Sequence, residues 1–203
     1  MTTSTQATQL QQLALYAAAA ATCADRYAKV FYPMIRDADE KFVCCVHGGE
    51  DMEHYLEAAE LLARRGVDTT GLVERPIAER GLPGPDVIEG ATSWTDRAVL
   101  SAVFERALLF QLHSLAHSGD AAIARLASFA APREDKHVAH GMALLRKATR
   151  SPEGRQNAQD AVARFLPVAF AVLEADRSQD AFVEAVRADL APLGLTIPER
   201  ASR

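Results

Sequence analysis

The sequence predicts an all-α protein whose core is a four-helix bundle. Apolar residues recur at steps of three and four over most of the chain, and no segment shows the period-two alternation of a half-buried strand. Alanine, the strongest helix former, is abundant in the same segments. Hydrophobic residues make up 49% of the 203 positions, which is enough for one core. We expect a single domain over residues 1–203, with the bundle at about 7–150 and extra helices at about 151–203.

Two helices are expected to form the first hairpin. The first runs from about Ala7 to Phe31, and the second runs from about Asp37 to Arg65. Pro33 favours a helix end because it lacks a backbone N–H, and Asp37 is of the type that caps a helix N-terminus. Gly66 follows the second helix and predicts its C-terminal cap.

A long connection and a second hairpin follow. Residues Val67 to Thr95 contain four glycines and three prolines, which is too long for a simple turn. We expect the third helix from about Asp96 to His117 and the fourth from Asp120 to Thr149. The extra C-terminal helices begin at Ser151-Pro152 and at about Gln179, and an extended tail covers Leu193 to Pro198.

Two short motifs place a carboxylate three residues before a histidine on a predicted helix. They are Asp51-Met52-Glu53-His54 and Glu134-Asp135-Lys136-His137. Residues at i and i+3 share a helix face, so each motif can direct one carboxylate and one imidazole to the same point. Four-helix proteins with carboxylate-bridged metal pairs combine two such motifs with one acidic residue from each of two other helices.

Asp25 and Glu105 are the candidates for the remaining two acidic ligands. Glu105 precedes Glu134 by 29 residues, and the turn at Ser118-Gly119-Asp120 lies midway, so both carboxylates reach one height in the bundle. Asp25 precedes Asp51 by 26 residues across the breaker-rich stretch after Pro33. The predicted metal ligands are therefore Asp25, Asp51, His54, Glu105, Glu134 and His137.

Other assignments of these residues stay open. Glu50 lies four residues before His54, and His47 lies four residues before Asp51, so either can replace a ligand of the second helix. Glu105 can form an ion pair with a cation such as Arg106 or be exposed, and Asp25 can be solvated. His113, His117 and His140 fit surface positions or supporting roles better than direct ligation.

Composition narrows the classes of metal and partner. Four carboxylates and two imidazoles form a hard ligand set that suits two iron ions, with manganese as the alternative. The net charge of −5 argues against nucleic acid or anionic membrane as partners. The three cysteines form no CxxC motif, and the apolar runs fall short of the ~18 residues that span a bilayer, so we expect a cytoplasmic protein.

From about Ala127 onward, the sequence resembles the catalytic subunit of phenylacetyl-CoA epoxidase, in the phenylacetic acid catabolic protein family. The resemblance is carried by Glu134-Asp135-Lys136-His137, by Ala158-Gln159-Asp160-Ala161-Val162 and by Leu193-Gly194-Leu195-Thr196-Ile197-Pro198. It implies a ferritin-like fold, two irons, O2 as co-substrate, electrons from a reductase and a related non-catalytic subunit. It also implies the same six ligands, with Asp25 and Asp51 standing where that family has glutamates.

The expected function is that of a di-iron oxygenase. Such an enzyme would hydroxylate or epoxidise an aromatic or hydrophobic acid, with an acyl-CoA thioester as one form of the substrate. The aspartates in place of glutamates motivate one alternative, a non-catalytic helical partner subunit of such an oxygenase. A related subunit or a second copy of this chain, in a homodimer, is a candidate partner. A ferritin-like iron-handling protein is the other alternative, and a closed shell in gel filtration would distinguish it.

Overall fold

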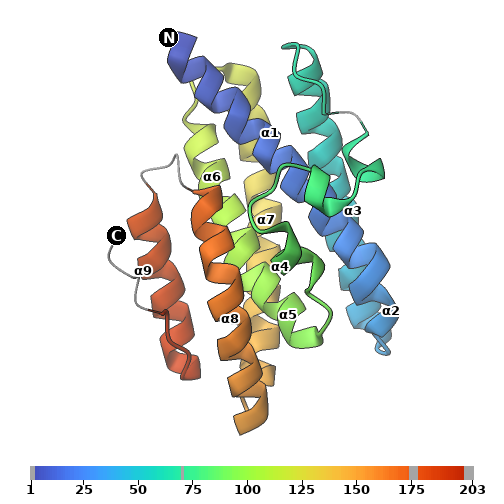
Figure 1. The fold of residues 1–203 in the computed structure, drawn as a ribbon, viewed down its shortest axis with the longest axis vertical. Helices are drawn as coiled ribbons and strands as arrows, with labels where there is room; N and C mark the ends of the chain where they lie inside the picture. Colours follow the sequence, from blue (N-terminus) through green and yellow to red (C-terminus); the bar gives the residue numbers. More distant parts are fainter. Residues whose placement is uncertain (1–2, 70, 174–177, 199–203) are drawn as a thin grey trace.

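The computed structural model describes residues 3–69, 71–173 and 178–198, and the regular elements in those ranges are all helices (Figure 1). The expected all-α class is confirmed. The predicted C-terminal region at 151–203 falls in part outside the described residues, namely at 174–177 and 199–203.

The first hairpin consists of α1 (Thr3–Arg26), η1 (Tyr27–Phe31), α2 (Tyr32–Met34) and α3 (Ala38–Ala63). Asp37 caps α3 as predicted, since its side chain accepts a hydrogen bond from the Glu40 backbone N–H at 2.9 Å. Gly66 follows the end of α3 with φ of 77°, a left-handed conformation that glycine adopts without steric cost. The hairpin thus begins and ends its second helix where the sequence indicates.

The described part of the long connection contains three short helical segments. They are η2 (Leu72–Glu74), η3 (Ile77–Glu79) and α4 (Pro85–Glu89). Leu72, Leu82 and Ile88 are buried, so this connection contributes to the core.

The second hairpin consists of α5 (Trp94–Val99), η4 (Leu100–Glu105), α6 (Arg106–Ala116) and α7 (Ala121–Ala148). The helix that was expected at Asp96 begins two residues earlier because Ser93 caps it. The Asp96 carboxylate in turn accepts from the Ser93 backbone N–H at 3.0 Å, which completes a capping box. Asp120 caps α7 by accepting from the Ala122 N–H at 2.9 Å.

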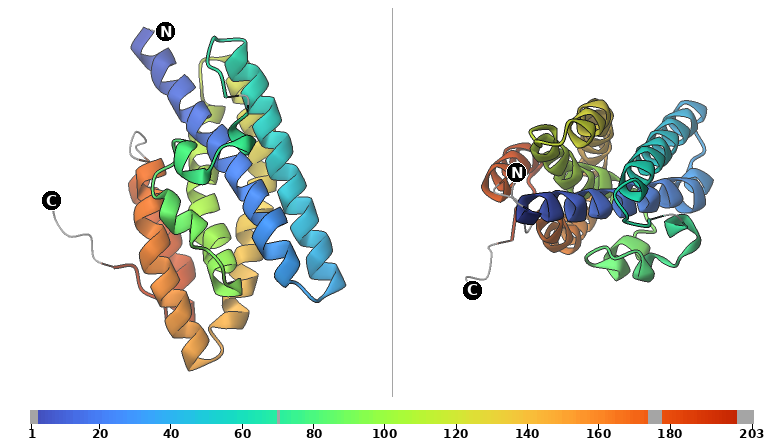
Figure 2. Two further views of the ribbon diagram at one scale, coloured as in Figure 1. Left: turned by 45° about the vertical axis from the view of Figure 1, so that its right-hand side comes forward. Right: turned by 90° about the horizontal axis from the view of Figure 1, so that it is seen from above.

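Two further helices, α8 (Pro152–Val172) and α9 (Gln179–Leu190), and a short turn, η5 (Ala191–Leu193), complete the described chain. Figures 1 and 2 show α8 and α9 on one flank of the molecule and α3 on the opposite flank. Between them, α1 packs on α3 and α6, while α7 packs on η4, α6 and α3. The two hairpins therefore face each other across one core.

Small side chains let α1 lie at the centre of this core. Residues Ala17 to Ala21 are all buried, with at most 3% of the surface of each exposed. A helix that is apolar all round is typical of a buried position. The sequence of α1 thus explains why this helix can approach α3 closely while α6 covers its other side.

One helical stretch is more apolar than we expected from the sequence, in which the apolar runs fall short of the length needed to span a bilayer. Within the described residues, the helical stretch Trp94–Ala116 is long and apolar enough to cross a membrane by length and composition. In the structure 83% of its apolar window is buried inside the protein, as in the core helix of a bundle.

Candidate metal centre

Five of the six predicted ligands converge in the middle of the core. Asp51 and His54 come from α3, Glu105 from the last position of η4, and Glu134 and His137 from α7. Each of the five is at most 1% exposed. Three carboxylates and two imidazoles therefore share a water-excluded site, which is costly unless their charges are balanced.

The spacing of ligand atoms around His137 suits a shared cation. Its Nδ1 lies 3.5 Å from Asp51 Oδ1, 3.7 Å from Glu134 Oε2 and 4.0 Å from Glu105 Oε2. Ligand atoms that each lie about 2.1 Å from one ion are roughly 3.0 to 3.4 Å from one another. Asp51, Glu134 and His137 offer one ligand atom each within 4.8 Å of one another. Small side-chain movements would close this triad on an ion.

Glu50 holds the other side of the His137 ring. His137 Nε2 lies 3.0 Å from Glu50 Oε2, and a carboxylate can only accept, so Nε2 donates and Nδ1 is the nitrogen that faces the cluster. A carboxylate behind a metal-binding histidine fixes the tautomer and the ring orientation. Of the two residues between which the sequence left the choice open, Asp51 therefore lies in the cluster, and Glu50 bonds to the far nitrogen of His137. His47, the other open candidate, stacks on His137 with ring centroids 4.0 Å apart.

Tyr16 of α1 bridges the remaining histidine to the cluster. Its hydroxyl lies 3.0 Å from His54 Nδ1 and donates to Glu134 Oε1 at 3.1 Å. His54 Nδ1 itself lies 3.5 Å from Glu134 Oε1. Tyr16 thus occupies the space between His54 and Glu134 and can hold a proton there.

Tyr27, the first residue of η1, connects the third carboxylate to the first hairpin. Its hydroxyl donates to Glu105 Oε1 at 3.1 Å and lies 3.0 Å from Ser101 Oγ. Glu105 ends the π-helical segment η4, and Tyr27 begins the other π-helical segment, η1. Such segments occur often at functional sites because the extra residue re-aims the side chains next to it.

The electrostatics of the centre favour protons or cations. Burial raises the pKa of Asp51 and of Glu105, His137 lowers both pKa values, and Glu134 raises them further. Burial alone would lower the pKa of His137, but Asp51, Glu50 and the other carboxylates outweigh it and raise that pKa to about 10. Without metal, the cluster therefore keeps protons, which a bound cation would replace.

Asp25, the sixth predicted ligand, is engaged elsewhere. Its carboxylate forms an ion pair with the buried Arg80 and another with Lys29 at 2.9 Å. The prediction placed Asp25 at the same level along the bundle axis as Asp51, but it did not determine on which side of the helix the Asp25 side chain lies. At about 100° per residue, Asp25 points roughly 200° away from Cys23, which faces the cluster.

The sequence interpretation missed the side chains that α1 and η1 direct toward the centre. They are Tyr16, Cys23 and Tyr27, all at most 1% exposed. Cys23 offers its sulfur within 4.8 Å of a carboxylate oxygen of Asp51 and one of Glu105. The signal was present in the sequence, because positions 16, 20, 23 and 27 follow the spacing of one helix face.

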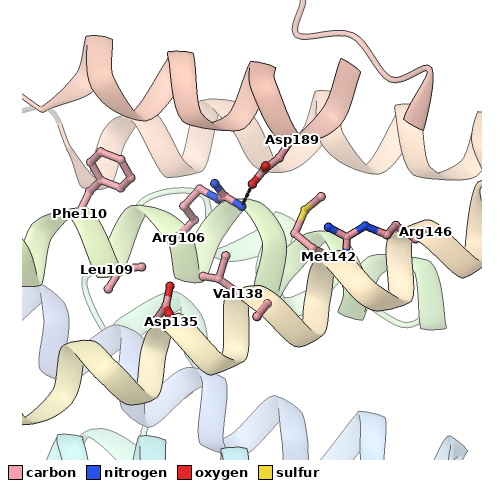
Figure 3. Close-up of a pocket in the computed structure, with 9 residues that line it drawn as sticks. Arg106, Leu109, Phe110, Asp135, Val138, Met142, Arg146 and Asp189 are labelled. Carbon is pink, nitrogen blue, oxygen red and sulfur yellow. Dashed lines mark hydrogen bonds and ion pairs between the residues drawn. The ribbon is translucent and has the colours of Figure 1, made fainter. Parts of the chain in front are cut away.

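An adjacent face of α7 lines a separate cavity. This cavity, of about 420 Å³, lies among α6, α7 and α9 (Figure 3). Val138 and Met142 line it, and the ion pair between Arg106 Nη2 and Asp189 Oδ2, 2.5 Å apart, closes one side. Glu134 and His137, by contrast, face the core, so both candidate ligands of the α7 motif lie on the same side of the helix.

A groove between α1 and α3 reaches the outer side of Tyr27. It has a volume of about 350 Å³ and is lined largely by small or apolar side chains, among them Ala24, Ala28, Gly48 and Met52. Gly48 leaves room for Tyr27, since a Cβ there would lie 3.1 Å from the Tyr27 Cβ. The Tyr27 side chain therefore separates the groove from Glu105.

The buried donor atoms fit a metal ion. Within residues 3–69, 71–173 and 178–198, Asp51 Oδ2, Glu134 Oε2, His54 Nε2 and His137 Nδ1 have no hydrogen-bond partner. Unpaired buried polar atoms are uncommon because each costs about 1–3 kcal/mol. Oxygen and imidazole donors of this kind suit iron or manganese.

Comparison with known proteins gives no match, either to a model of a protein family or to a curated protein. The interpretation of the centre therefore depends on its own geometry.

Proposed function

We propose that this protein is a ferritin-like di-iron oxygenase that uses O2 to hydroxylate or epoxidise an aromatic or hydrophobic acid. The observation that carries the proposal is the convergence of Asp51, His54, Glu105, Glu134 and His137 in a buried site with too few cations. The packing of two helical hairpins against each other supports a four-helix bundle. The resemblance to the epoxidase subunit points to the same chemistry.

The donor set would hold two cations with distinct surroundings. Asp51, Glu134 and His137 form one triad of donors, and Glu105 and His54 lie beside it. Carboxylates can bridge two ions because each has two oxygens with several lone pairs. Iron is the preferred metal and manganese the alternative, because oxygen and imidazole donors suit both.

Bound iron would supply the binding place for O2 and the electrons that reduce it, and a reductase would replenish those electrons. The protein residues do the rest. Glu50 orients the imidazole of His137, and Tyr16 can hold or deliver a proton at Glu134 Oε1. The apolar core excludes water, which protects the reaction from side reactions.

The groove between α1 and α3 is the proposed approach for substrate. Most of its lining is alanine, glycine, cysteine, tyrosine and methionine, which suits an aromatic ring or alkyl chain, and its carboxylate, Asp25, is already paired with Arg80 and Lys29. Tyr27 stands between groove and Glu105, so its side chain would have to contact any substrate that reaches the centre. An acyl-CoA thioester would leave its polar part outside.

Metal analysis and isotope labelling test the proposal. Anaerobic reconstitution with ferrous iron should give about two irons per chain after removal of loosely bound metal. With a chemical reductant, ¹⁸O2 and a panel of aromatic acids and their CoA thioesters, mass spectrometry should show one labelled oxygen in a product. A protein that binds no iron would overturn the metal centre, and two irons without labelled product from any substrate would overturn the oxygenase.

The pairing of Asp25 with Arg80 favours a second candidate, a non-catalytic partner subunit. Without Asp25 the donor set has one carboxylate fewer than predicted, which can reduce the metal content. One iron or none per chain, with stable binding to a related catalytic chain in gel filtration, would support this candidate instead. A closed shell of many copies would indicate iron handling.

A further inference from the structure

We propose that Cys23, Asp51 and Glu105 form a second cation site in which the thiolate of Cys23 is a ligand. This inference rests on the proposed metal centre and changes its donor set, which the sequence predicted to contain only oxygen and nitrogen. It also assigns α1 a ligand in place of Asp25.

The geometry places three donors from three helices around one point. Cys23 of α1, Asp51 of α3 and Glu105 of η4 each offer one ligand atom within 4.8 Å of the other two. Cys23 and Glu105 are fully buried, and Asp51 is 1% exposed. This is the same closeness and burial that Asp51, Glu134 and His137 show.

Asp51 belongs to both groups and can connect them. Its Oδ1 lies 3.5 Å from His137 Nδ1, whereas its Oδ2 has no hydrogen-bond partner among the described residues. A carboxylate can bind two ions at once, one through each oxygen. The unpaired Oδ2 is the independent sign that a cation belongs here, since a buried carboxylate oxygen without a partner is costly.

Two tyrosines lie on the same helix face as Cys23, Tyr16 in α1 and Tyr27 in η1, and both already have polar partners. The Tyr16 hydroxyl bonds to Glu134, and the Tyr27 hydroxyl bonds to Glu105 and lies near Ser101. Both hydroxyls therefore fix carboxylates in place, and the sulfur between them is the α1 donor closest in type to a metal ligand.

Burial alone does not explain the surroundings of Cys23, because cysteine is often buried for packing. Cys44 provides the comparison within this chain. It is also buried, but its Sγ contacts the backbone oxygen of Tyr27 at 3.6 Å. Cys44 is in neither candidate group of metal ligands among the described residues, whereas Cys23 lies between two carboxylates.

A sulfur ligand makes the two cation positions chemically different. Thiolate donors favour borderline or softer ions such as Co²⁺, Zn²⁺ and Fe²⁺ over Mn²⁺. The thiol must lose its proton to bind, so this position releases that proton to solvent when the ion enters. We therefore expect Co²⁺ to fill both positions and Mn²⁺ to bind well only at Asp51, Glu134 and His137.

Cobalt titration of metal-free protein tests the inference, with the Cys44→Ser/Cys45→Ser double variant as the main sample. That variant keeps Cys23 as its only cysteine. We expect about two Co²⁺ per chain, a thiolate-to-cobalt charge-transfer band in the near ultraviolet, and X-ray absorption showing one sulfur neighbour at about 2.3 Å. Cys23→Ser should lose the band and at least tenfold in affinity at one of the two positions.

The outcomes separate the two proposals. Two cobalt ions without a sulfur neighbour would overturn the role of Cys23 and leave the metal centre standing. One cobalt ion without a sulfur neighbour would likewise overturn it. No bound cobalt would overturn both proposals. The absorption data on the double variant decide the matter even when Cys23→Ser fails to fold.

Discussion

Two acidic groups differ in how their negative charge is balanced: the partly buried Asp25 of α1, and the buried carboxylates of the candidate metal centre. Around Asp25, two side-chain cations pair with a single carboxylate, and Arg80 also donates to backbone oxygens of Ala21 and Val73. In the candidate metal centre, Asp51, Glu105 and Glu134 are all buried. The positive groups near them are His137, which lies within 4.0 Å of each carboxylate, and the buried Arg97, whose charge lowers the pKa of Glu105.

The difference shows which of the two acidic groups obtains its counter-charges from the protein itself. The carboxylate of Asp25 obtains its counter-charges from the chain, so folding alone satisfies it. The centre instead keeps its acids by raising the pKa values of Asp51 and Glu105, an effect caused first by burial. A buried acidic site that its own chain leaves without enough cations favours an external one.

Removal of Glu134 should produce the largest effect. Glu134→Ala deletes the carboxylate that contacts both Tyr16 and the His54 ring. We expect iron content to fall from about two per chain to less than one, because a lost ligand costs more than the roughly 10–100-fold of a supporting residue. Elemental analysis and circular dichroism measure the loss and the retained helicity.

Asp25→Asn is the matched control for Glu134→Ala, since it removes the charge of the paired carboxylate. Its metal content should equal that of the wild type. Loss of iron in Asp25→Asn, or full iron in Glu134→Ala, would reverse the assignment of the two groups.

Removal of Arg80 should affect stability instead of metal binding. Arg80→Met leaves the Asp25 carboxylate with Lys29 alone and removes hydrogen bonds to Ala21 and Val73. Breaking a buried pair typically costs about 3–5 kcal/mol of unfolding free energy. Urea denaturation of the metal-free protein measures this, and the exposed Arg75→Met should change stability by no more than about 0.5 kcal/mol.

Unchanged iron content in Arg80→Met would show that the ion pair of Asp25 with Arg80 stabilises the fold and does not contribute to metal binding. If the variant loses iron while remaining folded, the two groups are coupled and the comparison fails.

Gly141→Ala should disturb the centre through packing. A Cβ at Gly141 would lie 2.6 Å from the Ser101 Cβ and 2.8 Å from the Ala102 N, so α7 would have to move away from η4. Such overpacking costs about 1–3 kcal/mol. Because Glu105 ends η4, we also expect roughly tenfold weaker iron binding, which a competitive chelator assay measures.

Gly49→Ala is the control, because its Cβ would meet no atom within 4 Å. It should raise stability by up to about 1 kcal/mol through helix propensity. Equal effects of the two alanines on iron affinity would show that the contact between α7 and η4 does not position the centre.

The sequence was sufficient for the fold class and for the convergence of five of the six candidate residues in the core, and the reasons are physical. Glu105, Glu134 and His137 are on helices whose turn is marked by Gly119, so their height could be counted. Counting residues along the helix was not sufficient for Asp25, because the side of α1 on which its carboxylate lies depends on how that helix packs. The π-helical segments at Tyr27 and Glu105 arise from tertiary packing and leave no pattern in the sequence.

The ion pair of Asp120 with Arg65 should contribute least among the charged groups compared, because both side chains are partly exposed. Partial burial raises the pKa of Asp120, but hydrogen bonds from Arg65 and from the Ile123 and Ala122 N–H groups outweigh it and lower that pKa below 3.8. The stabilisation is therefore present above about pH 4 and is lost as the pH falls through the lowered pKa. Asp120→Ala should cost about 1 kcal/mol at pH 7, as for other helix N-caps, and less at pH 2. Urea denaturation at both pH values measures the difference, and an equal cost at the two would mean that the carboxylate charge contributes nothing to this cap.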